Sequence, residues 1–179
     1  GPLVNLGLFF FGLETGPQAL RFARDFIKTL PGAATAFLGV GLSAPPAPFV
    51  PEQYRFRTGH ALLVAGFGSA AEHAALVAPI RTAVTPLFEL VTPMPFVALQ
   101  QMFNESATWG LLGYEKALYL DELSDAAIAV IGEHVPKKSS PLSFCPTFIM
   151  TGAYRALGDA DTAFGGSRSA AYVFNIEGA

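Results

Sequence analysis

A glycine-rich segment, Gly66-Phe67-Gly68-Ser69-Ala70-Ala71, has the first spacing in the chain that could support chemistry. It has the form G-x-G-x-x-A, lies between a predicted strand and a predicted helix, and is followed about twenty residues later by Glu89. Such a turn can bring a pyrophosphate to a helix N-terminus while the acidic residue binds a ribose. A tight strand-to-helix turn explains the glycines equally well, and the segment follows the third predicted strand. We therefore favour the turn over a dinucleotide site.

The histidines and the cysteine do not have the spacing of a reactive or metal-binding site. His60, His73 and His134 are separated by 13 and 61 residues, which fits neither a helical ligand pair nor an H-E-x-x-H motif. Cys145 lies in an apolar strand context, where buried thiols are usually inert. We expect no metal site, and histidines that lie on the surface or are hydrogen-bonded in the core. The sequence also lacks the G-x-S-x-G elbow of a serine nucleophile.

Polar side chains within apolar strands are the remaining candidates for chemistry. A predicted strand at 109–120 contains Tyr114 and Lys116, and the two-residue period of a strand places them on one face. The last predicted strand places Asn175 and Glu177 on one face in the same way. Such groups are either exposed to solvent or line a site that needs a few fixed donors and acceptors. The residues alone favour exposure.

Strands and helices alternate along the first half of the chain and must position these side chains. The segments Thr15–Gln18 and Ser69–Glu72 have the capping-box pattern that starts a helix. The order is strand, helix, strand, strand, helix, strand, which is that of the split-βαβ, ferredoxin-like fold. We expect these six elements at 3–13, 15–30, 33–42, 58–67, 69–82 and 84–91.

A proline-rich segment, 43–51, separates the second and third predicted strands, and we expect it to form a long exposed loop. The later elements are a short helix opened by a proline, a strand, a helix capped by Ser124 and two strands joined by a polar loop. We expect them at 95–103, 109–120, 124–135, 143–152 and 170–177, with the loop at 158–169. The fold class is therefore α+β and ferredoxin-like, with an antiparallel sheet of about seven strands and helices on one face, in a single domain of residues 1–179.

Composition and charge exclude several classes of protein. Of 179 residues, 51% are hydrophobic, which excludes disorder, and the net charge of −3 without any long Lys/Arg cluster excludes a nucleic-acid binder. The longest apolar run, Leu3–Leu13, is too short to span a membrane and lacks the basic start of a signal peptide. One cysteine excludes an internal disulfide. Charged residues make up 14%, against roughly 25% in an average domain, which indicates a surface covered by another domain or subunit.

Several segments, taken in order, resemble the substrate domain of FAD-linked oxidases of the berberine bridge enzyme-like group. They are Ala44–Glu52, Pro93–Gln100, Tyr114-Glu115-Lys116 and Leu120–Ser124. The resemblance implies a multistranded antiparallel sheet with helices on its outer face and its inner face over a flavin ring. It also implies an N-terminal FAD-binding domain, absent from this chain, that would hold most of the FAD.

The resemblance assigns roles to a few residues. Asn175-Ile176-Glu177 is similar to the family's last sheet strand, where the Gln or Glu faces the substrate, so Glu177 is the candidate catalytic base. Lys116 matches a lysine in the family's Tyr-x-Lys strand, which makes Tyr114 and Lys116, together with Asn175, candidates for substrate binding. No residue is assigned to FAD. The segment 164–168, Phe-Gly-Gly-Ser-Arg, departs from the Phe-Pro-His-Arg usual in the family.

We therefore interpret the chain as the substrate domain of a cytoplasmic FAD-dependent oxidoreductase that oxidises an alcohol, sugar or similar small molecule by hydride transfer to flavin. Because the chain begins Gly1-Pro2 without a Met, we expect a processed or excised piece that is inactive without its flavin domain. The alternative is a free-standing ferredoxin-like module that binds a ligand or partner and dimerises through its sheet face.

Overall fold

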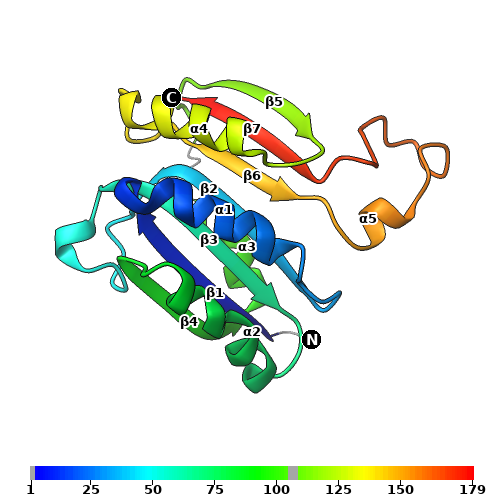
Figure 1. Cartoon of the computed structure of the whole chain (residues 1–179), viewed down its shortest axis with the longest axis horizontal. Coiled ribbons are helices and arrows are strands. Elements are labelled where there is room, and N and C mark those ends of the chain that lie inside the picture. Colours follow the sequence, from blue (N-terminus) through cyan, green and yellow to red (C-terminus); the bar gives the residue numbers. More distant parts are fainter. Residues whose placement is uncertain (1–2, 105–108) are drawn as a thin grey trace.

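A computed structural model describes residues 3–104 and 109–179. Within these ranges seven strands form one sheet in the order β4-β1-β3-β2-β6-β7-β5, and all of its pairings are antiparallel (Figure 1). The strands are β1 Leu3–Gly12, β2 Ala34–Ser43, β3 Thr58–Gly66, β4 Phe88–Pro95, β5 Tyr114–Leu120, β6 Cys145–Ile149 and β7 Tyr172–Gly178. The predicted class and the approximate strand number are confirmed.

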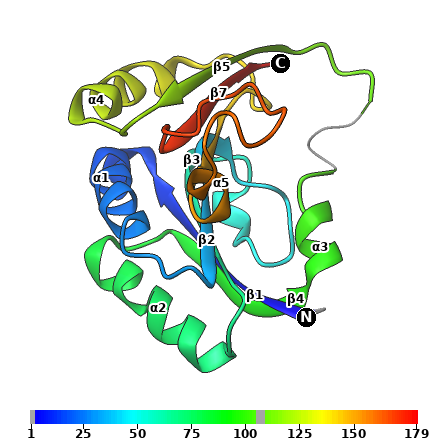
Figure 2. The ribbon, with the colours of Figure 1, turned by 90° about the vertical axis from the view of Figure 1, so that its right-hand side faces the viewer.

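The helices lie on both faces of the sheet, with the three longest on the same side. They are α1 Gly16–Ile27, α2 Ala70–Ala83, α3 Phe96–Gln101, α4 Asp125–His134 and α5 Ala153–Ala156. Figure 2 shows α1, α2 and α4 on one side, here called the helical face, and α3 on the other, here called the opposite face. The first six elements follow the predicted order, and their strands are arranged β4-β1-β3-β2, as in a ferredoxin-like fold.

The main core lies between the helical face and the three long helices α1, α2 and α4. Alternate strand residues such as Phe9, Leu38 and Leu62 are fully buried there. The apolar positions of α1 recur at intervals of three and four residues and pack against them. They are Ala19, Leu20, Ala23, Phe26 and Ile27.

A second apolar cluster covers the opposite face of β1, β3 and β4. Phe10 stacks on Phe88 with ring centroids 4.8 Å apart, and both belong to one apolar cluster with Ala44 and Val50 of the proline-rich segment. Ala44 and Val50 of that segment are each 1% exposed, so the prediction of an exposed loop was wrong. Prolines remove strand hydrogen bonds, but they do not prevent burial of the apolar residues between them.

Helix starts followed the predicted capping chemistry at two of three places. Ser69 accepts a hydrogen bond from the Glu72 backbone, and the Glu72 carboxylate accepts one from the Ser69 backbone, so this capping box is confirmed. Ser124 caps α4 by accepting from Ala127. The box predicted at Thr15 was wrong, because the chain enters α1 through a 3-10 turn, Leu13–Thr15, and the Thr15 hydroxyl donates to the Gly12 carbonyl instead.

Two strand boundaries differ from the prediction for identifiable reasons. β4 begins after Pro86 and continues to Pro95, because it is an edge strand whose prolines need not donate to a neighbour. β5 begins at Tyr114, so the stretch from Trp109, which includes Gly110 with a φ of +93°, precedes the ladder.

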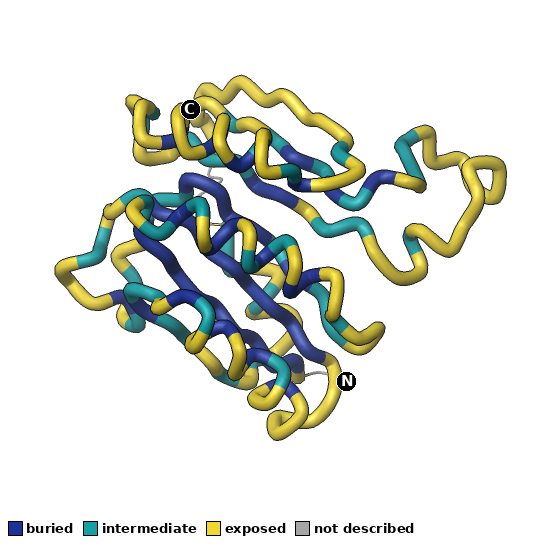
Figure 3. Tube along the Cα trace, viewed as in Figure 1, coloured by how far each residue is buried: buried dark blue, intermediate teal, exposed yellow. Residues whose placement is uncertain are grey.

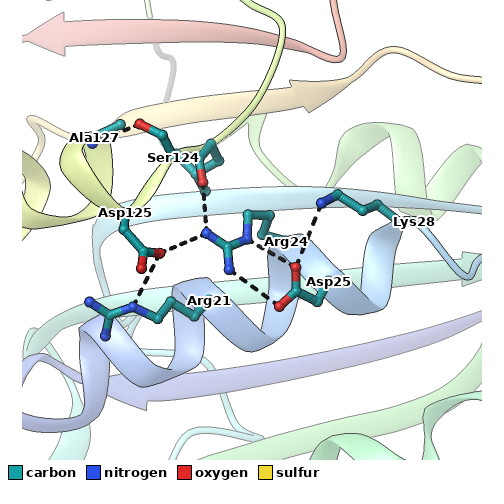
Figure 4. Close-up of polar contacts among 8 residues, drawn as sticks. Arg21, Arg24, Asp25, Lys28, Ser124, Asp125 and Ala127 are labelled. Carbon is teal, nitrogen blue, oxygen red and sulfur yellow. Dashed lines mark hydrogen bonds and ion pairs between the residues drawn. The ribbon is translucent and has the colours of Figure 1, made fainter.

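An ion-pair network joins α1 to the start of α4 (Figure 4). Arg24 donates to the Asp125 carboxylate at 2.7 Å and to the Leu123 carbonyl at 3.4 Å, and it also pairs with Asp25. Hydrogen bonds from Arg24 lower the pKa of both Asp25 and Asp125. The network therefore ties the β5–α4 connection to the helix of the main core. Among the described residues, none of the helices is long and apolar enough to cross a membrane.

Candidate functional site

The pairing of β5 with β7 brings three polar side chains together on the opposite face. Glu115 lies directly across from Glu177, and the neighbouring pair on that face is Ala117 and Asn175. Directly opposed residues of antiparallel strands project to the same face. The Asn175 amide donates a hydrogen bond to the Glu115 carboxylate, while its carbonyl oxygen is buried and has no hydrogen-bond partner among the described residues. The predicted shared face of Asn175 and Glu177 is confirmed, and Glu115 joins it.

The surroundings of Glu177 make its carboxylate a better proton acceptor than a fully exposed one. It is partly buried, and burial raises the pKa of its carboxyl, with a further increase from the negative charge of Glu115. Its backbone is fixed by two hydrogen bonds with Phe144, 2.9 and 3.2 Å long. A positioned carboxylate with a raised pKa is suited to act as a general base toward a hydroxyl.

Lys138 holds the chain segment that leads into this pairing. Its ammonium group donates to the carbonyls of Gly41 and Ser143 and to the hydroxyl of Ser43, at 2.8 to 2.9 Å. These bonds attach the segment before β6 to the end of β2. The position of Phe144, and with it the backbone of Glu177, therefore depends on Lys138.

The structure does not bring Tyr114 and Lys116 to Glu177. Lys116 lies across from Ile176, so both predicted binding residues project to the helical face, away from Glu115 and Glu177. Both are exposed, and the Lys116 ammonium lies 5.9 Å from the centre of the Tyr114 ring. The strand alternation that groups Tyr114 with Lys116 also separates them from the face of Glu177, because adjacent strands share one pleat.

Glu115 was missed by the sequence reasoning although it lies between the two residues that were chosen. The alternation of residues 114–120 already placed it on the face away from Tyr114 and Lys116. Its importance depends on the register with β7, which joins residues 60 positions apart.

An aromatic band runs along the same opposite face toward the polar residues. We define it as Phe103, Phe37, Phe148 and Tyr119. The Phe37 ring lies 5.5 Å from Phe103 and 5.4 Å from Phe148, between ring centroids. Phe148 and Tyr119 both lie across from Val173, which is two residues before Asn175. Almost half of the Phe148 and Tyr119 surfaces is exposed, so the band is an accessible apolar surface on the face of Glu177, which lies four residues beyond Val173 along β7.

A cavity of about 150 Å³ lies at the far end of this band. Apolar side chains, including Phe10, Phe88 and Phe103, form most of its described wall. Ser43 also lines it, but its hydroxyl donates to the Pro141 carbonyl and accepts from Lys138. The cavity is suited to an apolar group.

The segment 164–168, where the sequence departs from the family pattern, packs beside Tyr119. Arg168 lies over the rings of Tyr154 and Phe164, 4.8 Å from each ring centre, and donates to the Tyr154 carbonyl. A Cβ on Gly166 would lie 2.2 Å from the Tyr119 hydroxyl, which shows how closely this loop approaches the band. The loop therefore forms one end of the candidate site.

The glycine-rich segment is a turn whose helix end is already occupied. The Glu72 carboxylate accepts hydrogen bonds from the backbone and the hydroxyl of Ser69, so a ligand phosphate would compete with it. Gly66 is required because a Cβ there would lie 2.7 Å from the His73 ring. Glu89 is paired with Arg81.

The histidines and the cysteine lie where their structural interpretation predicted. His60 and His73 are buried, with His60 accepting a hydrogen bond from the Gly41 backbone and His73 within 3.1 Å of the Val64 carbonyl. His134 is exposed. Burial raises the pKa of the Cys145 thiol to about 11, so the thiolate is scarce at neutral pH. Across the described ranges, no three His, Cys, Asp or Glu residues are grouped as metal ligands.

Comparison with known proteins identifies the fold. The sequence matches no protein-family profile and no curated protein. Chitooligosaccharide oxidase is similar in structure with a TM-score of 0.71 and 18% identity, over 98% of this chain and 38% of that protein. Glucooligosaccharide oxidase from Acremonium strictum, an enzyme with a cysteinyl, histidyl FAD, has a TM-score of 0.71 and 14% identity, over 98% of this chain and 38% of that protein. Berberine bridge enzyme in complex with (S)-reticuline has a TM-score of 0.66 and 14% identity, over 97% of this chain and 35% of the enzyme.

These similarities confirm, at the level of the fold, the resemblance to FAD-linked oxidases of the berberine bridge enzyme-like group. The chain spans somewhat more than a third of the length of these structures, so its fold corresponds to one part of each.

Proposed function

We propose that this chain is the substrate domain of an FAD-dependent oxidoreductase and that the opposite face, around Glu177, receives the substrate. The observation that carries the proposal is the position of Glu177, a partly buried carboxyl with a raised pKa on the same sheet face as an accessible aromatic band. The shared fold with FAD-linked oxidases supplies the reaction class.

In this proposal the residues of the chain bind the substrate and move its proton. Glu177 accepts the proton of a substrate hydroxyl, and Asn175, held by Glu115, lies beside it on the same face. FAD, when bound, would supply a hydride acceptor. The aromatic band and the apolar cavity favour an alcohol with an apolar or aromatic body.

The FAD itself would be held mainly by another domain. Its pyrophosphate needs backbone donors or cations, and the glycine-rich turn that could have supplied them is filled by Glu72. The uncovered part of the opposite face can instead meet a flavin domain. The chain is therefore inactive by itself in this proposal, and a flavin domain is its partner.

The test combines the chain with the flavin domain encoded next to it in the genome. Flavin absorbance and oxidation of a panel of aromatic alcohols, aliphatic alcohols and sugars are followed. We expect turnover with both domains present, and a loss of at least about a hundredfold in Glu177→Gln, which removes the general base. Glu133→Gln is the matched control, because Glu133 is an exposed carboxylate on α4 that pairs with Lys137. Full activity of Glu177→Gln would contradict the assigned role.

A second candidate function is a ligand- or partner-binding module that dimerises through the same face. The exposed Phe148 and Tyr119 favour it, because apolar side chains exposed on a sheet face are often covered by a second copy. Sedimentation of the isolated chain distinguishes the two functions. A stable dimer that excludes the flavin domain and depends on Phe148 would replace the oxidoreductase proposal.

A further inference from the structure

A groove lies on the helical face, at the ends of the strands away from Glu177. This groove has a volume of about 390 Å³, which is within the range of about 300–1,000 Å³ typical of small-molecule sites. Its walls come from the end of α1, the start of β2, the segment after β5, the end of β6 and the start of β7. The two predicted site residues on this face, Tyr114 and Lys116, do not line it.

The groove exists because the sheet splits at this end. β2 pairs with β3 from Ala34 to Ser43, but it pairs with β6 only between Phe37 and Val40. Beyond that point β6 stays with β7, and the Met150 backbone donates to the Ala171 carbonyl. Figure 1 shows β6 continuing toward α5 while β2 remains with β3. The edge of β2 at 34–36 therefore faces the groove without a strand partner among the described residues.

Tyr172 supplies a polar group inside this groove. The residue as a whole is 2% exposed and lines the groove, and in the described part of the chain no side-chain hydrogen bond involves its hydroxyl. The hydroxyl is not one of the fully buried polar atoms that lack a partner, so it keeps access to solvent or to the groove. It can therefore donate a hydrogen bond to an occupant of the groove.

The rim of the groove carries charges of both signs on separate walls. Lys28 and Arg155 come from the α1 end and from α5, and Asp121 and Glu122 follow β5 directly. Lys28 makes a long contact of 3.7 Å with Asp25, outside the groove (Figure 4). In the described part of the chain, no ion pair links the other three to any residue. Apolar side chains of Ile27, Leu30 and Ile149 lie between the walls.

We propose that this groove binds a small zwitterion with an apolar body, of the class of a free amino acid with an aromatic side chain. The ligand carboxylate meets Lys28 and Arg155, its ammonium group meets Asp121 and Glu122, and its apolar side chain lies between Ile27 and Ile149. The Tyr172 hydroxyl donates to the ligand carboxylate. The groove lies on the helical face, whereas Glu177 lies on the opposite face, so the groove proposal does not depend on the oxidoreductase proposal.

The test titrates the chain with L-phenylalanine and follows backbone amide shifts by NMR and heat by calorimetry. Two further probes each lack one charge: 3-phenylpropionate has no ammonium group, and phenethylamine has no carboxylate. We expect saturable binding of phenylalanine, with shifts centred on Ala34, Thr151 and Ala171, and binding at least about fivefold weaker for each comparison probe.

Substitutions then locate the site. Tyr172→Phe removes only the hydroxyl and is expected to weaken binding about three- to tenfold. Arg155→Gln is expected to weaken the binding of phenylalanine and 3-phenylpropionate but not that of phenethylamine. Lys137 is an exposed cation on another part of the surface, so Lys137→Gln is the matched control and is expected to leave the binding of all three probes unchanged. Absence of saturable binding, equal binding of the three probes, or unchanged binding in both groove variants would overturn the proposal.

Discussion

The two halves of the sheet differ sharply in burial, although their strands belong to one hydrogen-bonded sheet. In β1 and β3 every residue after the first is buried, whereas six of the seven residues of β5 are exposed. Figure 3 shows the buried strands concentrated in the part formed by β4, β1, β3 and β2, here called the N-terminal region. We call β6, β7 and β5 with α4 the C-terminal region.

The difference has a structural cause and a functional meaning. The N-terminal region has α1 and α2 on one face and α3 with the proline-rich segment on the other, so β1 and β3 are buried on both sides. The C-terminal region has α4 on the helical face, and Figure 2 shows none of the labelled helices over β5 and β7 on the opposite face. The first region supplies stability, and the second keeps polar groups accessible, as a binding site requires.

The largest expected difference between the regions comes from removing one leucine from each. Leu62→Ala in β3 creates a cavity in the core and is expected to cost about 2–5 kcal/mol of unfolding free energy. Leu118→Ala in β5, where the side chain is 50% exposed, is expected to cost under about 1 kcal/mol. Urea unfolding measures both. Equal losses would show that the C-terminal region shares the core's role.

Acidification acts on the N-terminal region through His60. Burial lowers the pKa of His60 from 6.5 to about 4, so the unfolded chain takes up a proton at higher pH than the folded chain. Stability is therefore complete above pH 6.5 and falls as pH decreases toward 4, by up to about 3 kcal/mol.

Thermal unfolding across this pH range checks the effect of His60. His60→Gln should remove most of the dependence, and His134→Gln, which changes an exposed histidine, should leave it intact. The pH dependence of stability that Glu177 contributes has the opposite sign. Its raised pKa stabilises the folded chain at low pH, and this stabilisation is lost as the pH rises through the pKa of the folded state. A profile that is the same in the His60 variant would contradict the assignment.

Two glycines test the difference in packing at the level of the backbone. A Cβ on Gly59 would lie 2.3 Å from the Phe11 carbonyl oxygen, whereas one on Gly113 would lie 3.8 Å from the nearest atom, the Gly178 oxygen. Gly59→Ala is expected to cost about 1–3 kcal/mol, and Gly113→Ala to stay within about 0.5 kcal/mol of the parent. Chemical denaturation of the two variants should rank them in that order, and the reverse order would show that β1 and β3 can separate easily.

The smallest expected effect concerns the contact between the regions. Asp125→Asn removes the carboxylate that Arg24 and Arg21 share, but both arginines and the aspartate reach solvent. Exposed ion pairs contribute little and are screened by salt. We expect a small decrease in the unfolding midpoint at low ionic strength that disappears in 1 M salt. A large decrease that persists in salt would mean that the regions are held together by this network.

Much of the fold could be predicted because its signals are local. The order of the first six elements, the caps at Ser69 and Ser124, and the shared face of Asn175 and Glu177 all come from patterns within one segment. The exposure of the proline-rich segment could not be predicted, because Ala44 and Val50 are buried against strands distant in the sequence. The Thr15 box failed because the preceding turn was not visible as a pattern.

The sequence by itself determined the α+β class, the strand alternation and the residues able to accept a proton. Only the tertiary structure decided that Glu115, Asn175 and Glu177 lie together and that Tyr114 and Lys116 lie on the other face. The physical reason is that alternation defines the two faces of a strand, whereas the register between two strands defines which faces coincide. That register depends on packing of the whole sheet, which no single segment encodes.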